Sequence, residues 1–218
     1  MKLVKKTSKI KILVNGLLEE FSVRIILASN SRPRKKIFDI LGFKYEIITS
    51  KCEEHSDQTD FSKYVMELSK TKANSVKEQL SGEKALIIAA DTIAAMGDKK
   101  FEKPKSKQEA FENMMAFSSK VNEAFTGVTI IDLYQNKEIT FFDKTEIHLR
   151  NIDENDARWY VENDEHILER AGYSMCDGLA CIFVDKIIGD FYTIAGMPVG
   201  KLFENLKALG YEMKDLIN

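Results

Sequence analysis

The chain has 218 residues, of which 44% are hydrophobic and 30% are charged, and its formal net charge is −2. This composition is typical of a globular protein with a substantial core and excludes an intrinsically disordered chain. The balanced charge argues against a protein that binds DNA or RNA, because such proteins usually carry a basic excess.

The first 22 residues are basic and then weakly apolar, without the pattern of a targeting segment. Asn15, Glu19 and Glu20 interrupt any signal-peptide core, and no apolar run approaches the roughly 20 residues of a membrane span. The three cysteines have no paired metal-ligand spacing, so we expect reduced thiols and no structural zinc. The sequence predicts a cytoplasmic protein with an N-terminal extension (1–22) and a single domain (23–218).

The predicted domain begins with a polar loop between a strand and a helix. Residues 23–28 (VRIILA) predict a buried strand, the sequence SNSRPRKK predicts a loop, and the following helix ends at Gly42. A second strand is predicted at residues 45–49. The hydroxyls and up to four cations of the loop indicate either a phosphate-binding turn or a solvated basic turn.

A long helix is predicted from an N-cap at Asp60 to about Leu80. Lys72 lies four residues after Leu68 and therefore falls on the inward apolar face, whereas Lys70 points away. An inward lysine needs an anion to offset its desolvation. The alternative is a lysine whose ammonium group reaches the surface along the helix.

Carboxylates stand at two places where a ligand can bind. The most apolar predicted strand, residues 85–90 (ALIIAA), stops at Asp91, which either caps the next turn or belongs to a ligand site at the end of a strand. Glu53 and Glu54 lie in the polar loop before the long helix. Together with Asp91, they are suitable ligands for Mg²⁺, which prefers oxygen donors.

The remaining sequence alternates strands with helices. We expect helices at residues 106–117, 153–162 and 199–209, strands at 123–133 and 137–150, and hairpins at Gly97-Asp98 and across residues 180–192. Helices interleaved with long adjacent strands predict an α/β fold with a mixed sheet.

Several segments, taken in chain order, carry a resemblance to a known family: LASNSRPRKKIFDILGF, LSKTKA, AADT, EKP, FTGVTI, DKTEI, ERAGYSMCDGLA and GDFYTIAGMPV. From about Val23 to Leu209 the chain resembles the Maf family of nucleotide pyrophosphatases, which are distantly similar to inosine triphosphate pyrophosphatases. The resemblance implies a mixed, elongated sheet flanked by helices, with a deep central cleft and often a homodimer. The implied reaction converts nucleoside triphosphates to the monophosphate and pyrophosphate with Mg²⁺ or Mn²⁺.

The resemblance also implies roles for individual positions. Asp91 matches the proton acceptor of the family, and Glu54 matches an acidic residue near the metal, so both are expected metal-binding residues. Positions that match phosphate-binding residues are Ser29, Arg34, Lys72 and Lys103.

Three departures from the family pattern weaken or alter these expectations. Pro33 occupies the first of two arginine positions, with a cation displaced to Arg32, and Glu102 replaces the glycine before Lys103. Residues 118–119 (Ser-Ser) replace a Ser-Gly pair.

The base preference is expected to depend on Pro33, Thr92 and Asp177. A carboxylate at Asp177 can accept hydrogen bonds from the N1–H and N2 amine of guanine, unless Asp177 only begins a turn before Gly178. The position resembles the branch of the family that has a glutamate followed by Gly-Leu-Gly there, and this resemblance implies a 7-methyl-GTP-type substrate. Thr92, in contrast, resembles the residue found at this position in the pyrimidine-selective branch of the family. The alternatives are a dTTP/UTP pyrophosphatase and a non-enzymatic nucleotide-binding regulator of cell division.

Overall fold

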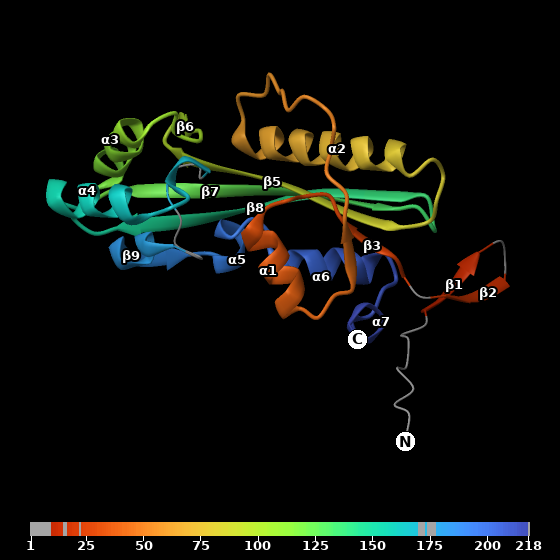
Figure 1. Ribbon diagram of the computed structural model, residues 1–218. Coiled ribbons are helices and arrows are strands. Elements are labelled where there is room, and N and C mark those ends of the chain that lie inside the picture. Colours follow the sequence, from red (N-terminus) through yellow and green to blue (C-terminus); the bar gives the residue numbers. More distant parts are fainter. Residues whose placement is uncertain (1–9, 15–16, 22, 170–172, 174–177, 218) are drawn as a thin grey trace. The chain divides into compact units, whose positions relative to one another are not determined.

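The structure is a computed structural model that describes residues 10–14, 17–21, 23–169, 173 and 178–217 (Figure 1). The chain divides into two compact units. The first consists of Met1–Asp91, Gly127–Phe142 and Val199–Asn218, and the second of Thr92–Thr126 and Asp143–Pro198. Among the described helices, none combines the length and apolar character that crossing a membrane requires.

The described strands form a small hairpin and a seven-stranded mixed sheet. The strands are β1 (Ile10–Val14), β2 (Leu17–Phe21), β3 (Ile25–Leu27), β4 (Tyr45–Ile47), β5 (Leu86–Met96), β6 (Lys99–Phe101), β7 (Val121–Asp132), β8 (Lys137–Leu149) and β9 (Val184–Ile188). β1 pairs with β2 inside the expected extension. The large sheet has the order β4-β3-β5-β7-β8-β9, and β6 pairs with β5.

Seven α-helices and two short 3₁₀ helices are described. They are α1 (Arg32–Ile40), α2 (Phe61–Gln79), α3 (Lys107–Phe117), α4 (Glu154–Asn163), α5 (Phe191–Ile194), α6 (Val199–Ala208), α7 (Met213–Leu216), and the 3₁₀ helices Ile167–Glu169 and Leu179–Phe183. The expected mixed α/β sheet flanked by helices is confirmed. The division into an extension (1–22) and one domain (23–218) stays a prediction.

The first unit is organised around parallel strands. β3 pairs in parallel with both β4 and β5, and parallel neighbours require crossover connections, which α1 and α2 supply. Within this unit, α2 lies on one face of the sheet and α1 and α6 on the other (Figure 1). Residues 25–27 and 86–90 are buried on both faces, which explains their unbroken apolar sequence.

Helix α2 has the cap and the phase that the sequence predicts. The side chain of Asp60 accepts hydrogen bonds from the backbone N–H groups of Ser62 and Lys63. Lys72 is buried together with Val65, whereas Lys70 is exposed. The inward orientation of Lys72 is therefore confirmed.

Helix α2 packs on β7 with almost no space between the two backbones. A Cβ atom added to Gly127 would lie 2.3 Å from the carbonyl carbon and oxygen of Val65. Beside this contact, the buried hydroxyls of Ser69 and Thr129 lie 2.9 Å apart, and Thr129 in turn lies 3.0 Å from the hydroxyl of Thr140 on β8. Ser69 also donates to the carbonyl of Met66. The close approach of α2 and β7 requires glycine at position 127, because it has no side chain.

The second unit has its own apolar core, in which α3 and α4 cover residues of β7 and β8. As predicted, Ser106 caps α3 by accepting from the N–H of Glu109, and Asp153 caps α4 by accepting from that of Asp156. Ser119, where the resemblance implies a glycine, has a φ of 58°. Glycine suits this left-handed backbone better than serine, because a side chain there costs about 1 kcal/mol.

Three sequence-based boundaries are wrong. Helix α1 begins at Arg32 rather than after the basic loop, because Pro33 has the fixed φ that suits a first helical turn. β5 continues through Asp91 to Met96, since a charged partner lets a carboxylate remain inside a strand. The residues between Ala180 and Tyr192 do not form a hairpin, because β9 pairs with the distant β8 instead.

The contact at Gly127 predicts a strong effect of a single methyl group. Gly127→Ala should lower the free energy of unfolding by about 3 kcal/mol, because the new Cβ overlaps rigid backbone atoms. Gly200→Ala is the matched control, since a Cβ at this helical position meets no atom within 4 Å, and its stability should stay within about 0.5 kcal/mol of the parent. Urea denaturation measures both, and equal stabilities of the two variants would contradict the close packing.

Candidate active site

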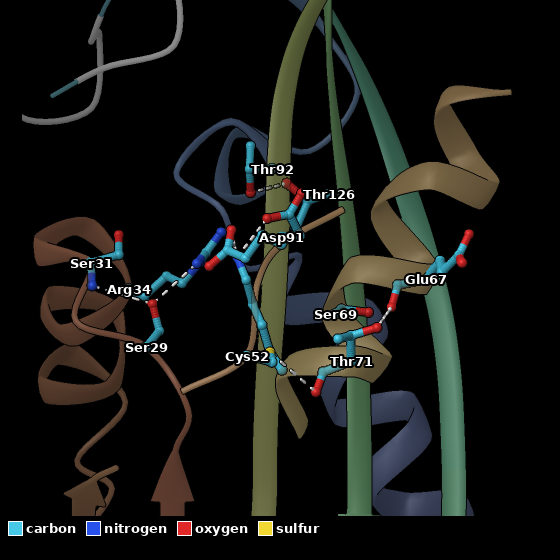
Figure 2. Close-up of polar contacts among 12 residues, drawn as sticks. Ser29, Ser31, Arg34, Cys52, Glu67, Ser69, Thr71, Asp91, Thr92 and Thr126 are labelled. Atoms are coloured by element: carbon cyan, nitrogen blue, oxygen red, sulfur yellow. Dashed lines mark hydrogen bonds and ion pairs between the residues drawn. The ribbon is translucent and has the colours of Figure 1, made fainter. Parts of the chain in front are cut away.

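The loop after β3 and the first turn of α1 position a hydroxyl and a guanidinium. The Oγ of Ser29 accepts hydrogen bonds from the backbone N–H of Ser31 at 3.2 Å and from Nη1 of Arg34 at 3.1 Å. The Arg34 side chain extends from α1 towards Asp91 on β5 (Figure 2). Burial lowers the pKa of Arg34, and the carboxylates of Asp91 and Glu54 oppose this effect. Arginine nevertheless stays charged, because its normal pKa is far above neutral.

Lys72 lies at the centre of the charged cluster. Its Nζ donates to Oδ1 of Asp91 at 2.7 Å and lies 2.9 Å from Oε2 of Glu54. The side chains of Lys72 and Asp91 are each only 11% exposed, whereas that of Glu54 is 50% exposed. The ion pair between Lys72 and Asp91 is therefore largely shielded from water, and it offsets the cost of burying each charge.

Glu54 reaches Lys72 from a loop (residues 50–59) that lies along α2. The backbone N–H of Lys51 donates to Ser75 Oγ at 3.0 Å, and Ser56 Oγ donates to Glu67 Oε2 at 2.8 Å. Between them, the thiol of Cys52 lies 3.8 Å from the carbonyl of Thr71 (Figure 2). The loop therefore runs antiparallel to α2, and these contacts place Glu54 beside Lys72.

The cluster in the first unit brings together most of the residues expected from the sequence. Five of the expected residues lie there: Ser29, Arg34, Glu54, Lys72 and Asp91. Two carboxylates face two cations, so the cluster is electrically balanced as it stands. A cluster without net charge best accommodates an anion that binds together with a cation.

The carboxylates fit a divalent cation of the Mg²⁺ type. Glu54 and Asp91 both contact the same ammonium nitrogen, so their oxygens lie within two hydrogen-bond lengths of each other. No group of three or more His, Cys, Asp or Glu side chains suited to a metal occurs among the described residues. Mg²⁺ is commonly held by one or two carboxylates together with substrate phosphates, and Glu54 with Asp91 supply that number.

In the second unit, Thr92 belongs to a row of hydrogen-bonded threonines. The Oγ1 of Thr92 lies 2.9 Å from the Oγ1 of Thr126 (Figure 2). The hydroxyl of Thr126 donates to the carbonyl of Thr193 at 2.7 Å. The hydroxyl of Thr193 donates to Asp143 at 2.5 Å. Because Thr126 has a single proton, which goes to Thr193, it accepts the hydrogen bond from Thr92.

The other expected residues are placed separately or not described. Lys103 is exposed on the loop between β6 and α3, in the second unit, and Glu102 beside it pairs with Lys100 at 3.1 Å. Pro33 lies in the first turn of α1. Asp177 lies outside the described residues.

Comparison with known proteins shows the family. A family model described as "Maf-like protein" matches residues 24–209. The chain belongs to the Maf family. A dTTP/UTP pyrophosphatase of Thermoanaerobacter sp. (strain X514) is 35% identical over 185 residues, which cover 85% of this chain and 96% of that protein. A dTTP/UTP pyrophosphatase of Clostridium tetani (strain Massachusetts / E88) is 34% identical over 193 residues, covering 88% and 100%.

Among solved structures, the Ham1 protein of Staphylococcus aureus is similar with a TM-score of 0.42 and 13% identity, over 58% of this chain and 71% of that one. This likeness is too weak to bear on function.

The expectation of a 7-methyl-GTP-type substrate is not supported by these Maf relatives, which are named for dTTP and UTP. That expectation depended on Asp177, which lies outside the described residues. Thr92, which matches the pyrimidine branch, agrees with the names of the relatives. The alternative stated from the sequence therefore fits the relatives better.

Sequence reasoning missed Thr126. The residue is fully buried, and the apolar neighbours in its strand gave no reason to assign it a polar role. A signal was available in the period-2 pattern of β7, in which Ala124, Thr126 and Val128 share one face. A threonine on a buried face needs a hydrogen-bond partner, which here is the carbonyl of Thr193.

Removal of the Thr126 hydroxyl tests the row of threonines. Thr126→Val should lower the free energy of unfolding by about 1–3 kcal/mol, because the buried carbonyl of Thr193 loses the hydroxyl donor and keeps only the backbone N–H of Gly196. Thr126→Ser keeps the hydroxyl and should remain closer to the parent. Both are measured by urea denaturation, and an equal loss in the two variants would mean that the methyl group, rather than the hydroxyl, carries the effect.

Proposed function

We propose that this Maf protein is a nucleoside triphosphate pyrophosphatase that acts on dTTP and UTP. The observation that carries the proposal is the buried ion pair of Lys72 with Asp91, joined by Glu54 at the same nitrogen. In this proposal Lys72 binds a phosphate, and the carboxylates beside it hold a metal and supply a base. The match to the relatives named for dTTP and UTP covers almost the entire length of those proteins, which supports the same reaction here.

Phosphate binding is assigned to residues that already carry positive charge at the site. Arg34 is held by Ser29 and directed towards Asp91, and Lys72 is buried beside it. Both cations neutralise the triphosphate and the pyrophosphate that leaves. Lys103 is proposed as a further phosphate ligand on the match to the family alone.

In the proposed reaction, a water molecule attacks the α-phosphorus of the nucleotide. The new bond joins the water oxygen to this phosphorus, and the bond from the phosphorus to the α–β bridging oxygen breaks. The water proton passes to Oδ2 or Oδ1 of Asp91, which acts as general base. The products are the nucleoside monophosphate and pyrophosphate, and the bridging oxygen leaves with the pyrophosphate.

A divalent cation, Mg²⁺ or Mn²⁺, is proposed as the cofactor, with Glu54 and Asp91 as its protein ligands. Such a cation, when bound, supplies a Lewis acid that neutralises phosphate charge. The residues themselves do the remaining work: Asp91 receives the proton, and Lys72 and Arg34 hold the phosphates.

Thr92 is proposed to contribute to the choice of a pyrimidine base. Its hydroxyl proton is directed to Thr126, which leaves the oxygen of Thr92 with acceptor character. Uracil and thymine have an N3–H that needs an acceptor, and a polar site matched to it discriminates against bases with another pattern.

A nucleotide panel tests the activity and the substrate. Purified protein with Mg²⁺ or Mn²⁺ should release pyrophosphate from dTTP and UTP with a kcat/KM at least about tenfold above that for GTP and 7-methyl-GTP. A higher kcat/KM for either guanine nucleotide would overturn the pyrimidine assignment. Tight nucleotide binding without pyrophosphate release would instead favour a non-enzymatic regulator.

Asp91→Asn tests the general base. The substitution keeps the shape of the side chain but removes its basicity, so kcat should fall by about 10²–10⁴-fold while the fold persists. Asp98→Asn on the exposed turn between β5 and β6 is the matched control and should retain parental kcat. Stopped assays of pyrophosphate release give kcat, and parental turnover in Asp91→Asn would remove this residue from the mechanism.

A further inference from the structure

We propose that Lys72 serves as the internal counter-cation of the metal site, so that divalent metal binds strongly only together with the nucleotide. This inference rests on the proposed function, because it concerns the same two carboxylates. It adds an order to the binding events and assigns that order to one side chain.

The first argument is positional. Nζ of Lys72 lies 2.7 Å from Asp91 and 2.9 Å from Glu54, which is the place where a cation shared by both carboxylates has to be. An ammonium group and a metal ion cannot occupy it together. Metal binding to these two ligands therefore requires Lys72 to move away.

The second argument is electrostatic. Arg34 and Lys72 balance Glu54 and Asp91. A divalent cation entering alone would leave two unbalanced positive charges in a cluster in which all groups except Glu54 are largely buried. Such an excess is costly where water is scarce. A triphosphate that arrives with the metal reverses this imbalance, because its negative charge exceeds that of the cation.

The third argument concerns what Lys72 can do when it moves. A lysine ammonium is a point charge on a flexible four-carbon chain, unlike the rigid fork of arginine. It can leave the carboxylates for a phosphate oxygen without a change in helix α2. The nucleotide thus exposes the metal ligands, and the metal in turn strengthens nucleotide binding, since coupling between two ligands is reciprocal.

The experiment measures Mn²⁺ binding to nucleotide-free protein, from the free Mn²⁺ signal in electron paramagnetic resonance. Lys72→Met removes the ammonium but keeps an unbranched chain that ends one atom earlier, and it should bind Mn²⁺ at least about tenfold more tightly than the parent. Lys70→Met is the matched control, because Lys70 lies on the same helix and also pairs with one carboxylate, Glu138, at 2.7 Å. Its Mn²⁺ affinity should equal that of the parent.

Glu54→Gln added to Lys72→Met should return the Mn²⁺ affinity towards the parental value, which assigns the gain to this site. No gain in Lys72→Met, or the same gain in Lys70→Met, would overturn the inference. Circular dichroism of each variant verifies the fold. These outcomes differ from failure of the proposed function, which would appear as absence of pyrophosphate release by the parent protein.

A second measurement needs no variant. Calorimetry with a non-hydrolysable α,β-imido analogue of dUTP should give an affinity at least about tenfold higher with saturating Mg²⁺ than with a chelator. Equal affinities in the two conditions would show that metal and nucleotide bind independently and would overturn the inference.

Discussion

The contact between α2 and β7 at Gly127 is the constraint on which the cluster depends. Because no side chain separates the helix from the strand, α2 has one depth and one rotation on the sheet. Ser69 and Thr129 fix the same register through buried hydroxyls. Lys72 lies on the helix less than one turn after Ser69, so this packing places its ammonium group beside Asp91 on β5. A small displacement of the helix would separate the two charges.

Ion pairs hold the charged cluster together although its residues differ in exposure. Lys72 and Asp91 are shielded, and each is tolerated there because the other is present. Arg34 extends from α1 and donates a hydrogen bond to Ser29 in the loop after β3. The proposed chemistry uses the same groups twice, first as mutual partners and then as ligands of metal and phosphate.

Much of the site was predictable because periodicity and capping are local properties. The cap at Asp60 fixed the start of α2, and spacing from Leu68 turned Lys72 inward, as the structure has it. The continuation of β5 beyond Asp91 was not predictable, since it depends on a lysine 19 residues earlier in the chain. The same holds for β9, whose partner β8 is distant in sequence, and for Thr126, whose acceptor belongs to residue 193. The roles of the site residues, in contrast to their positions, remain predictions.

The loop that carries Glu54 differs in kind from the strand that carries Asp91. Asp91 belongs to a strand whose preceding residues are completely buried, so its amide hydrogen should exchange with solvent only in large-scale unfolding. The loop is attached to α2 through separate polar contacts at Lys51, Cys52 and Ser56, and most of its residues are exposed. Segments of this kind open locally at a small free-energy cost. One carboxylate of the pair thus belongs to a buried strand, whereas the other is carried by an exposed loop that needs less free energy to open locally.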